Sequence, residues 1–189
     1  IMPRRNCLTR PPVANIDKLV IVMAPCRPSP DLLLADMLIA YCKYLGIKPV
    51  ICINKCDIDT TEAEKLKAQF TNSNITALTI SAKEKQGIEE LENELSGGVA
   101  CFAGQSAVGK STIINLLLPQ AQLATGDLSK KTERGKHTTR HCEILYLPNG
   151  GQVIDTPGFS MLEQIKMPPE EFSRLYDEYE DYSLNCRFR

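Results

Sequence analysis

Short apolar runs alternate with segments of helical period along most of the chain. Runs rich in valine and isoleucine, with the length of buried strands, predict strands at 18–24, 49–54, 75–81 and 99–104. Segments of helical period lie between and after them, at 32–45, 60–70, 87–95 and 111–118. The alternation favours an α/β fold, with a mostly parallel sheet covered by helices on both faces.

Several helix ends carry their own signals. Asp31 is predicted to cap the helix at 32–45, and Gly46 to end it. The next helix is expected to begin at Thr60 or Thr61, and Gly97–Gly98 break the helix at 87–95.

The two ends of the chain are less regular. Residues 1–17 are basic, carry prolines and show no period, which predicts an extended linker. Apolar runs at 142–147 and 152–156 flank Pro-Asn-Gly-Gly and predict a β-hairpin, which adds an antiparallel edge strand. Two prolines open a predicted final helix at 168–182.

Residues 104–111 read Gly-Gln-Ser-Ala-Val-Gly-Lys-Ser and join a predicted strand to a predicted helix. This is the context of a phosphate-binding loop, where glycines let backbone N–H groups surround a phosphate. Lys110 would contact the β- and γ-phosphates, and the Ser111 hydroxyl would bind Mg²⁺. An ordinary glycine-rich turn is the alternative, and the strand–loop–helix context argues against it. The predicted phosphate-binding residues are Gly104, Gln105, Ser106, Ala107, Val108, Gly109, Lys110, Ser111 and Thr112.

Two further motifs end strands and suit a guanine base. In Asn54-Lys55-Cys56-Asp57, the Asp57 carboxylate would accept both adjacent guanine donors, which adenine lacks. Asn54 would bond N7, and the Lys55 stem would lie along the base. Backbone N–H groups of Ser81-Ala82-Lys83 would reach guanine O6. A P-loop kinase that uses ATP leaves Asn54 and Asp57 unexplained.

Asp155-Thr156-Pro157-Gly158 follows another predicted strand. Asp155 would hold the Mg²⁺ shell through water, and the Gly158 N–H would meet the γ-phosphate. Ligands of open α/β sheets bind at the carboxyl ends of strands, where all these motifs fall.

The motifs occur in the order base, base, phosphate, magnesium, which reverses the usual GTPase order. A circular permutation explains this, because it changes the order in sequence and leaves each strand in place. The helix at 87–95 would carry the chain from the sheet edge back to its centre. The fold predicted is therefore a circularly permuted P-loop GTPase fold.

The sequence resembles the circularly permuted, ribosome small-subunit-dependent GTPases of the RsgA/YjeQ type. The matching stretches are RPPVANID, NKCD, SAK, AGQSAVGKSTIINLLLP, GKHTTRH, IDTPGF and CRFR. The resemblance implies GTP hydrolysis to GDP coupled to late maturation of the small (30S) ribosomal subunit, with contacts to its 16S rRNA. Family members usually carry glycine at the position of Ala107, and we expect the loop to tolerate the added methyl group.

The resemblance also implies a domain organisation. Residues 1–17 would be the linker from a missing N-terminal OB domain, 18–165 the GTPase domain, and 166–189 the start of a C-terminal zinc subdomain. Cys186 would be the first Zn²⁺ ligand, in a site that this chain leaves incomplete.

Catalysis poses a separate question, because Phe159 stands where Ras-type GTPases place a glutamine that orients water. His137 in the polar stretch 120–141 is the candidate replacement. Thr139, with Thr138 as the near alternative, would bind Mg²⁺ and the γ-phosphate. Phe159 also keeps open a second hypothesis, a nucleotide-gated rRNA-binding module in which hydrolysis is incidental.

Composition narrows the setting. The chain has 22 basic and 23 acidic residues among 189, so overall charge does not suggest a nucleic-acid binder. Eight cysteines without a CxxC pair, mostly inside apolar runs, favour a reducing, cytoplasmic setting. No apolar run approaches the ~20 residues of a membrane span. We expect the protein to be a monomer.

Overall fold

The computed structural model describes residues 3–9, 12–118, 143–155, 167–179 and 187. A six-stranded sheet has the order β5-β4-β3-β6-β8-β7. Its strands are β3 (Lys18–Met23), β4 (Lys48–Ile53), β5 (Thr76–Thr79), β6 (Val99–Ala103), β7 (Glu143–Tyr146) and β8 (Gln152–Asp155). All neighbours pair in parallel except β7 and β8, so the predicted antiparallel edge strand is confirmed.

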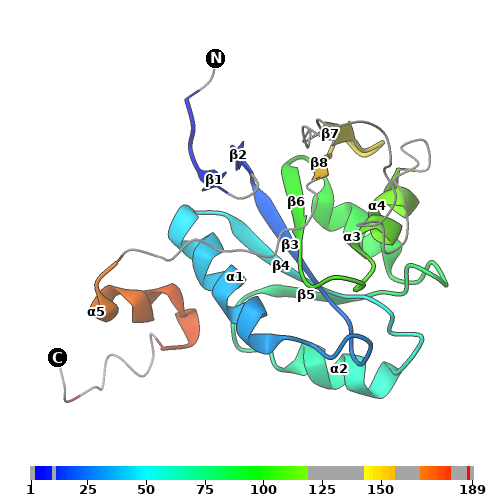
Figure 1. Ribbon diagram of the computed structural model, residues 1–189, viewed down its shortest axis with the longest axis horizontal. Coiled ribbons are helices and arrows are strands. Elements are labelled where there is room, and N and C mark those ends of the chain that lie inside the picture. The colour runs from blue at the N-terminus through cyan, green and yellow to red at the C-terminus, as the bar shows by residue number, and fades with distance from the viewer. Residues whose placement is uncertain (1–2, 10–11, 119–142, 156–166, 180–186, 188–189) are drawn as a thin grey trace, which may run out of the picture.

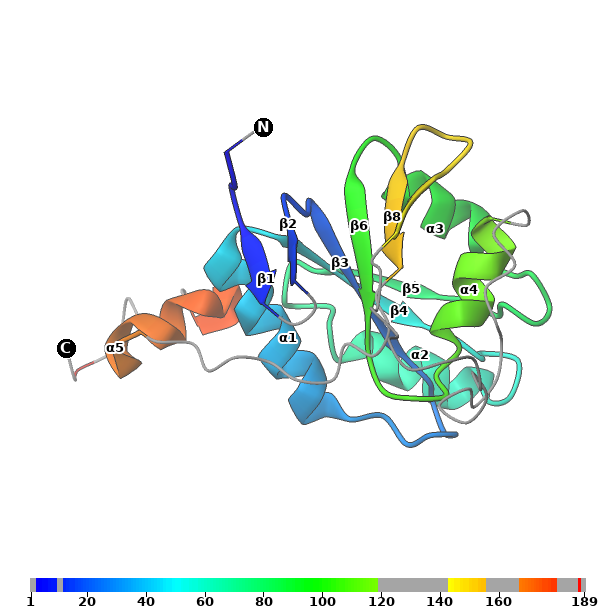
Figure 2. The same ribbon diagram turned by 45° about the horizontal axis from the view of Figure 1, so that its top comes forward.

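Two pairs of helices cover opposite faces of the sheet (Figures 1 and 2). The helices are α1 (Leu32–Leu45), α2 (Thr60–Ala68), α3 (Ile88–Leu95) and α4 (Lys110–Leu117). Buried side chains of α1 and α2 belong to one apolar cluster, and those of α3 and α4 to the other. Because β5 is an edge strand and β6 is central, α3 carries the chain from edge to centre as predicted.

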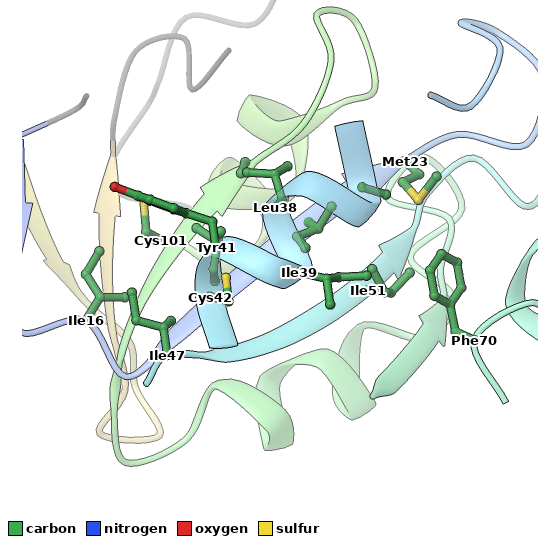
Figure 3. Close-up of a cluster of buried hydrophobic side chains, with 14 of the residues drawn as sticks. Ile16, Met23, Leu38, Ile39, Tyr41, Cys42, Ile47, Ile51, Phe70 and Cys101 are labelled. Carbon is green, nitrogen blue, oxygen red and sulfur yellow. The ribbon is translucent and has the colours of Figure 1, made fainter. Parts of the chain in front are cut away.

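The central strands are buried on both faces, which is why their sequences are continuously apolar. On β3, Leu19, Ile21 and Met23 join the cluster with α1 and α2, while Val20 and Val22 face α3 and α4. Figure 3 shows the first cluster, in which Leu38 and Ile39 of α1 lie over Ile51 of β4. None of the described helices is long and apolar enough to cross a membrane.

Helix ends follow local chemistry. Asp31 caps α1 as predicted, accepting a hydrogen bond from the Leu34 N–H at 2.9 Å, and Gly46 ends it in the left-handed conformation. Helix α2 does start at Thr60, and its cap is Asp59, whose carboxylate accepts from the Glu62 N–H.

The N-terminal segment is not the extended chain that its sequence predicted. β1 (Cys7–Thr9) and β2 (Pro12–Ala14) form an antiparallel hairpin. Leu8, Val13 and Ile16 are buried in the cluster with α1. The hairpin forms because these apolar residues pack against the edge of that cluster. Strands this short show no clear periodicity, so the sequence did not predict the hairpin.

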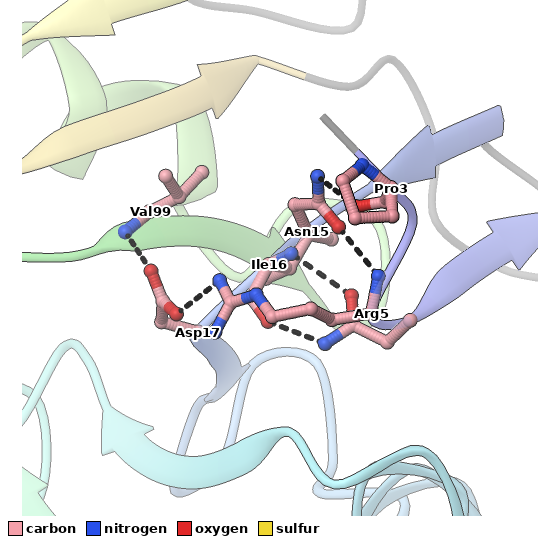
Figure 4. Close-up of polar contacts among 7 residues, drawn as sticks. Pro3, Arg5, Asn15, Ile16, Asp17 and Val99 are labelled. Atoms are coloured by element: carbon pink, nitrogen blue, oxygen red, sulfur yellow. Dashed lines mark hydrogen bonds and ion pairs between the residues drawn. The ribbon is translucent and has the colours of Figure 1, made fainter. Parts of the chain in front are cut away.

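Polar contacts tie this hairpin to the sheet (Figure 4). The Asn6 amide donates to the Ile16 carbonyl oxygen at 2.8 Å and accepts from the Ile16 N–H at 2.9 Å, as a neighbouring strand would. Asp17 accepts from the Val99 N–H at 2.9 Å and pairs with Arg5. The start of β3 is thereby joined to the start of β6, the strand that leads into the phosphate loop.

The predicted helix at 168–182 is also wrong in part. The structure has α5 (Pro169–Phe172), followed by short 3-10 turns at Ser173–Leu175 and Asp177–Tyr179. Tyr176 is extended between these turns, and its ring packs against those of Phe172 and Tyr179. Leu175 is buried and its turn packs beside α1, which outweighs a helix propensity that Phe172, Ser173 and Tyr176 keep weak.

Asp17 supplies a test of the joint between β3 and β6. Asp17→Ala removes the acceptor of the Val99 N–H and should lower the free energy of unfolding by about 1–2 kcal/mol at neutral pH. The Val99 hydrogen bond first, and Arg5 second, hold the pKa of Asp17 below its ordinary 3.8. Such a carboxylate stabilises the fold above its unfolded pKa and loses the effect as pH falls through the folded pKa.

The difference in free energy of unfolding between Asp17→Ala and the parent should therefore become smaller in strongly acid solution. Urea unfolding at several pH values measures this difference. Arg5→Gln is the matched control. It breaks a mostly exposed ion pair and should cost less than about 1 kcal/mol. A difference that stays constant from neutral to acid pH would show that the Asp17 charge contributes nothing.

Candidate nucleotide-binding site

The predicted motifs converge at one edge of the sheet. Strands β3, β4, β5, β6 and β8 run parallel, so their carboxyl ends share that edge. Asn54 follows β4, Ser81 lies two residues beyond β5, and Gly104 follows β6. Asp155 ends β8, and its side chain lies outside the described residues. The reversed order of motifs in the sequence is thus compatible with one site.

The phosphate loop depends on glycine at both ends. Gly104 has φ +132°, and a Cβ there would overlap the carbonyl oxygen of Val22 on β3. Gly109 has φ +99°, and a Cβ there would overlap the Asn54 amide. Between them, Val108 is fully buried and anchors the loop in the core. The two glycines therefore let the loop lie directly against Val22 of β3 and against Asn54 after β4, as a backbone cradle for a phosphate would require.

Lys110 opens α4 and points back into the loop. Its Nζ donates to the carbonyl oxygen of Gly104 at 2.7 Å and also to that of Gln105. Burial lowers the pKa of Lys110, and its ammonium forms no ion pair with a carboxylate among the residues that the structure describes. A bound phosphate would compensate this charge. Ser111 and Thr112 follow in the first turn of α4 and are exposed at this end of the sheet.

Asn54 is the residue that joins the phosphate loop to the base motifs. Its side chain is 2 % exposed, and its Nδ2 donates to the Val108 carbonyl oxygen at 2.8 Å. Its Oδ1 accepts from the Ala82 N–H at 3.0 Å. The second Nδ2 hydrogen is the one left for the predicted bond to guanine N7.

Lys55 makes a second connection to the phosphate loop. Its backbone is left-handed, with φ +67°, and its Nζ donates at 2.7 Å to the carbonyl oxygens of both Ala107 and Arg27. The side chain therefore spans the space between the two loops, as expected for a stem that lies along a base. The contact with Arg27 was not predicted, because nothing in the residue types around it signals a carbonyl acceptor.

Asp57 is exposed and held in place by a neighbour. The Ser81 hydroxyl donates to its Oδ1 at 2.6 Å and accepts from the Glu84 N–H at 3.1 Å. Ser81 is fully buried, and its backbone pairs with Gln86. The other carboxylate oxygen of Asp57 is left for a ligand. The hydrogen bond from Ser81 fixes where this carboxylate lies relative to the sheet. This positioning role of the Ser81 side chain was missed, because the prediction used only its backbone N–H.

The remaining base-motif residues act through the backbone. Cys56 donates its N–H to the Ile80 carbonyl oxygen, and burial followed by Asp57 raises the pKa of its thiol, which stays neutral at pH 7. The Lys83 ammonium turns to Glu84 in an exposed ion pair. The Ser81 and Ala82 N–H groups have protein acceptors, so the Lys83 N–H is the free donor for guanine O6 among the described residues.

Several predicted residues lie outside the described residues, namely His137, Thr138, Thr139, Gly158, Phe159 and Cys186. No group of three or more metal-ligating side chains occurs among the residues that the structure does describe. For Mg²⁺, Ser111 is the one predicted ligand whose side chain is described.

The fold and this site define a circularly permuted P-loop protein with the nucleotide-site architecture of the GTPases. The RsgA GTPase family model matches residues 1–165, and the chain belongs to that family. A crystal structure of YjeQ from Thermotoga maritima is similar, with a TM-score of 0.79 and 31% identity over 95% of this chain and 61% of that one. The structure of YloQ, described as a circularly permuted GTPase, has a TM-score of 0.77 at 30% identity and covers the whole chain and 61% of YloQ.

Curated relatives carry the name small ribosomal subunit biogenesis GTPase RsgA. The protein of Ruminiclostridium cellulolyticum is 43% identical over 188 residues, which are 100% of this chain and 62% of the relative. That of Caldanaerobacter subterraneus subsp. tengcongensis is 44% identical over 189 residues, or 64% of the relative. The chain therefore spans a little over three fifths of these relatives.

Ala107 permits a test of backbone strain in the loop. Its φ is +62°, a left-handed conformation that costs a residue with a Cβ roughly 1 kcal/mol. Ala107→Gly should therefore raise the free energy of unfolding by up to about 1 kcal/mol, less the extra chain entropy of glycine. Urea unfolding of the nucleotide-free chain measures it.

Ala103→Gly at the end of β6 is the control for the Ala107 variant. Ala103 is fully buried and not left-handed, so that change should destabilise the chain. Equal destabilisation by both substitutions would mean that Ala107 carries no strain.

Asp57 carries the second test. Asp57→Asn keeps an acceptor for the Ser81 hydroxyl and replaces a carboxylate oxygen by an amide donor. GTP should bind on the order of 10²–10⁴-fold more weakly, and XTP more tightly, because xanthine offers an oxygen where guanine has its 2-amino group. Calorimetry with both nucleotides measures the change.

Glu84→Gln is the control for the Asp57 variant, because it neutralises a carboxylate on the adjacent turn without touching Asp57. It should leave the preference for GTP intact. Unchanged GTP affinity in Asp57→Asn would refute the assignment of Asp57 to the base.

Proposed function

We propose that the chain binds GTP and hydrolyses it to GDP and phosphate, as part of a longer protein that acts in maturation of the small ribosomal subunit. One observation carries the nucleotide part. The buried Asn54 amide holds Val108 of the phosphate loop and Ala82 of the base loop together, so one ligand spans both. Membership of the RsgA GTPase family supports the choice of reaction.

Guanine selection is assigned to Asp57, whose carboxylate matches the two adjacent donors on guanine. The Ser81 hydroxyl at 2.6 Å fixes the direction in which it accepts. Because these bonds replace bonds to water, a base without the donors leaves a carboxylate unpaired.

Phosphate binding is assigned to the backbone of Gly104–Gly109 and to Lys110. Mg²⁺, when bound, neutralises charge on the β- and γ-phosphates. Ser111 would hold it directly, Thr139 would add a ligand, and Asp155 would act through water. The Gly158 N–H would meet the γ-phosphate. The exposed position of Ser111 at the start of α4 fits this role.

The attacking water needs a residue to orient it, and Phe159 has no group that can do so. We assign this task to His137, whose imidazole can accept or donate a proton. Since His137 and Thr139 share a polar stretch, binding of the γ-phosphate would bring both to the site together.

The proposed cellular role rests on the names of the relatives. The partners proposed are the small ribosomal subunit and its 16S rRNA, in the cytoplasm, with the protein a monomer. An OB domain would precede residues 1–17, and a zinc subdomain would begin near 166–189, with Cys186 as its first ligand. Cys186 by itself cannot form a tetrahedral site, so no zinc chemistry is assigned to this chain.

The alternative is a nucleotide-gated rRNA-binding module, favoured by Phe159, an apolar residue at the sequence position where Ras-type GTPases have a glutamine that orients water. Turnover of GTP by the longer protein, with and without small subunits, separates the two. The enzyme hypothesis expects slow turnover alone, on the order of 10⁻⁴–10⁻³ s⁻¹, and clear acceleration by the subunit. Turnover that small subunits leave unchanged would favour the module.

His137→Ala in the longer protein should remove most of that acceleration, by a factor of ~10²–10⁴, while GTP affinity stays nearly constant. His141→Ala is the control, since it removes the other histidine of the chain from the same polar stretch. Stimulation of His137→Ala as full as that of the parent would assign the water to the backbone or to the subunit.

A further inference from the structure

A second candidate surface lies where the C-terminal segment runs beside α1, on the side of the molecule away from α3 and α4 (Figures 1 and 2). Leu33, Met37 and Tyr44 stand on one stripe of α1 and are 71%, 48% and 43% exposed. Phe172 and Tyr179 add exposed rings from the neighbouring segment. We call these five side chains the α1 face.

A cavity of about 150 Å³ opens next to the α1 face. Its apolar walls include Leu32 and Ile39 from α1, the Phe70 ring beyond α2, and the Tyr176 ring of the C-terminal segment. A cavity of this size accepts a benzene-sized group, and a guanidinium is planar and smaller.

Two carboxylates also line this cavity, Asp36 from α1 and Glu178 from the C-terminal segment. Neither belongs to an ion pair among the described residues, whereas the adjacent Asp177 pairs with Lys43. Burial first, and Glu178 second, raise the pKa of Asp36. Unbalanced negative charge in a partly apolar cavity is a cost that a cation from outside would remove.

We propose that this surface docks an amphipathic, arginine-bearing segment of a protein partner, with a guanidinium in the cavity and apolar side chains along the α1 face. Carboxylates together with aromatic rings suit the planar guanidinium better than an ammonium, because it pairs with carboxylates in a fork and stacks on rings. The same carboxylates repel phosphates, which disfavours RNA as the occupant. The proposal is independent of the nucleotide site.

The test uses a fluorescein-labelled helical peptide with leucine on one side and arginine on the other, and a matched peptide with neutral citrulline in place of arginine. Fluorescence anisotropy at physiological salt measures binding to the whole chain. Asp36→Asn/Glu178→Gln should lower the affinity for the arginine peptide by on the order of 10–10²-fold and leave the affinity for the citrulline peptide unchanged. Met37→Ser should weaken both peptides.

The matched control is Glu89→Gln/Glu90→Gln, which removes the same charge from exposed positions on α3. It should change arginine-peptide binding less than twofold. Because Asp36→Asn/Glu178→Gln relieves repulsion between neighbouring carboxylates, its melting temperature should not fall, and GTP affinity should equal that of the parent. In the unmodified chain, peptide-induced NMR shifts should centre on α1 and residues 172–179.

Several outcomes would overturn the proposal. If the α3 control loses as much affinity for the arginine peptide as Asp36→Asn/Glu178→Gln, the attraction is non-specific. If the unmodified chain binds the citrulline and arginine peptides equally well, the cavity takes no cation. An RNA oligonucleotide that displaces the peptide would make the surface an RNA site. A dimer in sedimentation that Met37→Ser dissociates would make the α1 face an interface between copies of this chain.

Discussion

The site is organised around one buried amide, that of Asn54. It satisfies a carbonyl of the phosphate loop and an N–H of the base loop at once, at 2.8 and 3.0 Å. Gly109 must lack a Cβ for Asn54 to sit there, so the glycine of one motif and the asparagine of another constrain each other. Removing the amide would leave two buried polar backbone groups unpaired and uncouple the loops. The proposed base recognition and phosphate binding would therefore depend on the same two hydrogen bonds.

Circular permutation leaves this arrangement intact, and the strands that begin the domain and follow the new crossover are joined at the amino ends of the parallel strands. There the chain enters at β3 and makes its new crossover through α3 to β6. Asp17 holds the Val99 N–H, and Lys18 and Lys48 both meet Glu94 near the end of α3. These contacts lie at the end of the sheet opposite the candidate nucleotide site. The amino end thus carries the stabilising contacts, while the carboxyl end carries the site.

Unpaired charges of opposite sign lie at two separate places among the described residues. In the phosphate loop, Lys110 is a partly buried cation that pairs with no carboxylate in the described part of the chain, as suits a site for an anion. Beside α1, Asp36 and Glu178 are carboxylates without a cation among the described residues, which fits a cationic partner. Both departures from charge balance are local, and the near-zero net charge of the whole chain conceals them.

Much of the fold and site could be predicted from sequence, because the signals are local. Continuous apolar runs mark strands buried on both faces, Asp31 and Gly46 mark the ends of α1, and strand-ending motifs place the site at one sheet edge. The hairpin at Cys7–Ala14 could not be predicted, since its short strands form only against a cluster assembled from distant segments. The broken helix at Pro169–Tyr179 could not be predicted for the same reason, as Leu175 and Tyr176 pack beside α1.

The sequence by itself determined the class of protein, because loop geometry and base recognition demand particular residue types at fixed spacing. It also determined the permutation, through the order of those motifs. Only the tertiary structure decided which hydrogen bonds those residues form with one another. Asn54 bonds to Val108 and Ala82, and Ser81 bonds to Asp57. Lys55 bonds to Ala107 and Arg27. Such partners lie 24 to 54 residues apart, and hydrogen bonds over that range depend on how helices and strands pack, which no local pattern encodes.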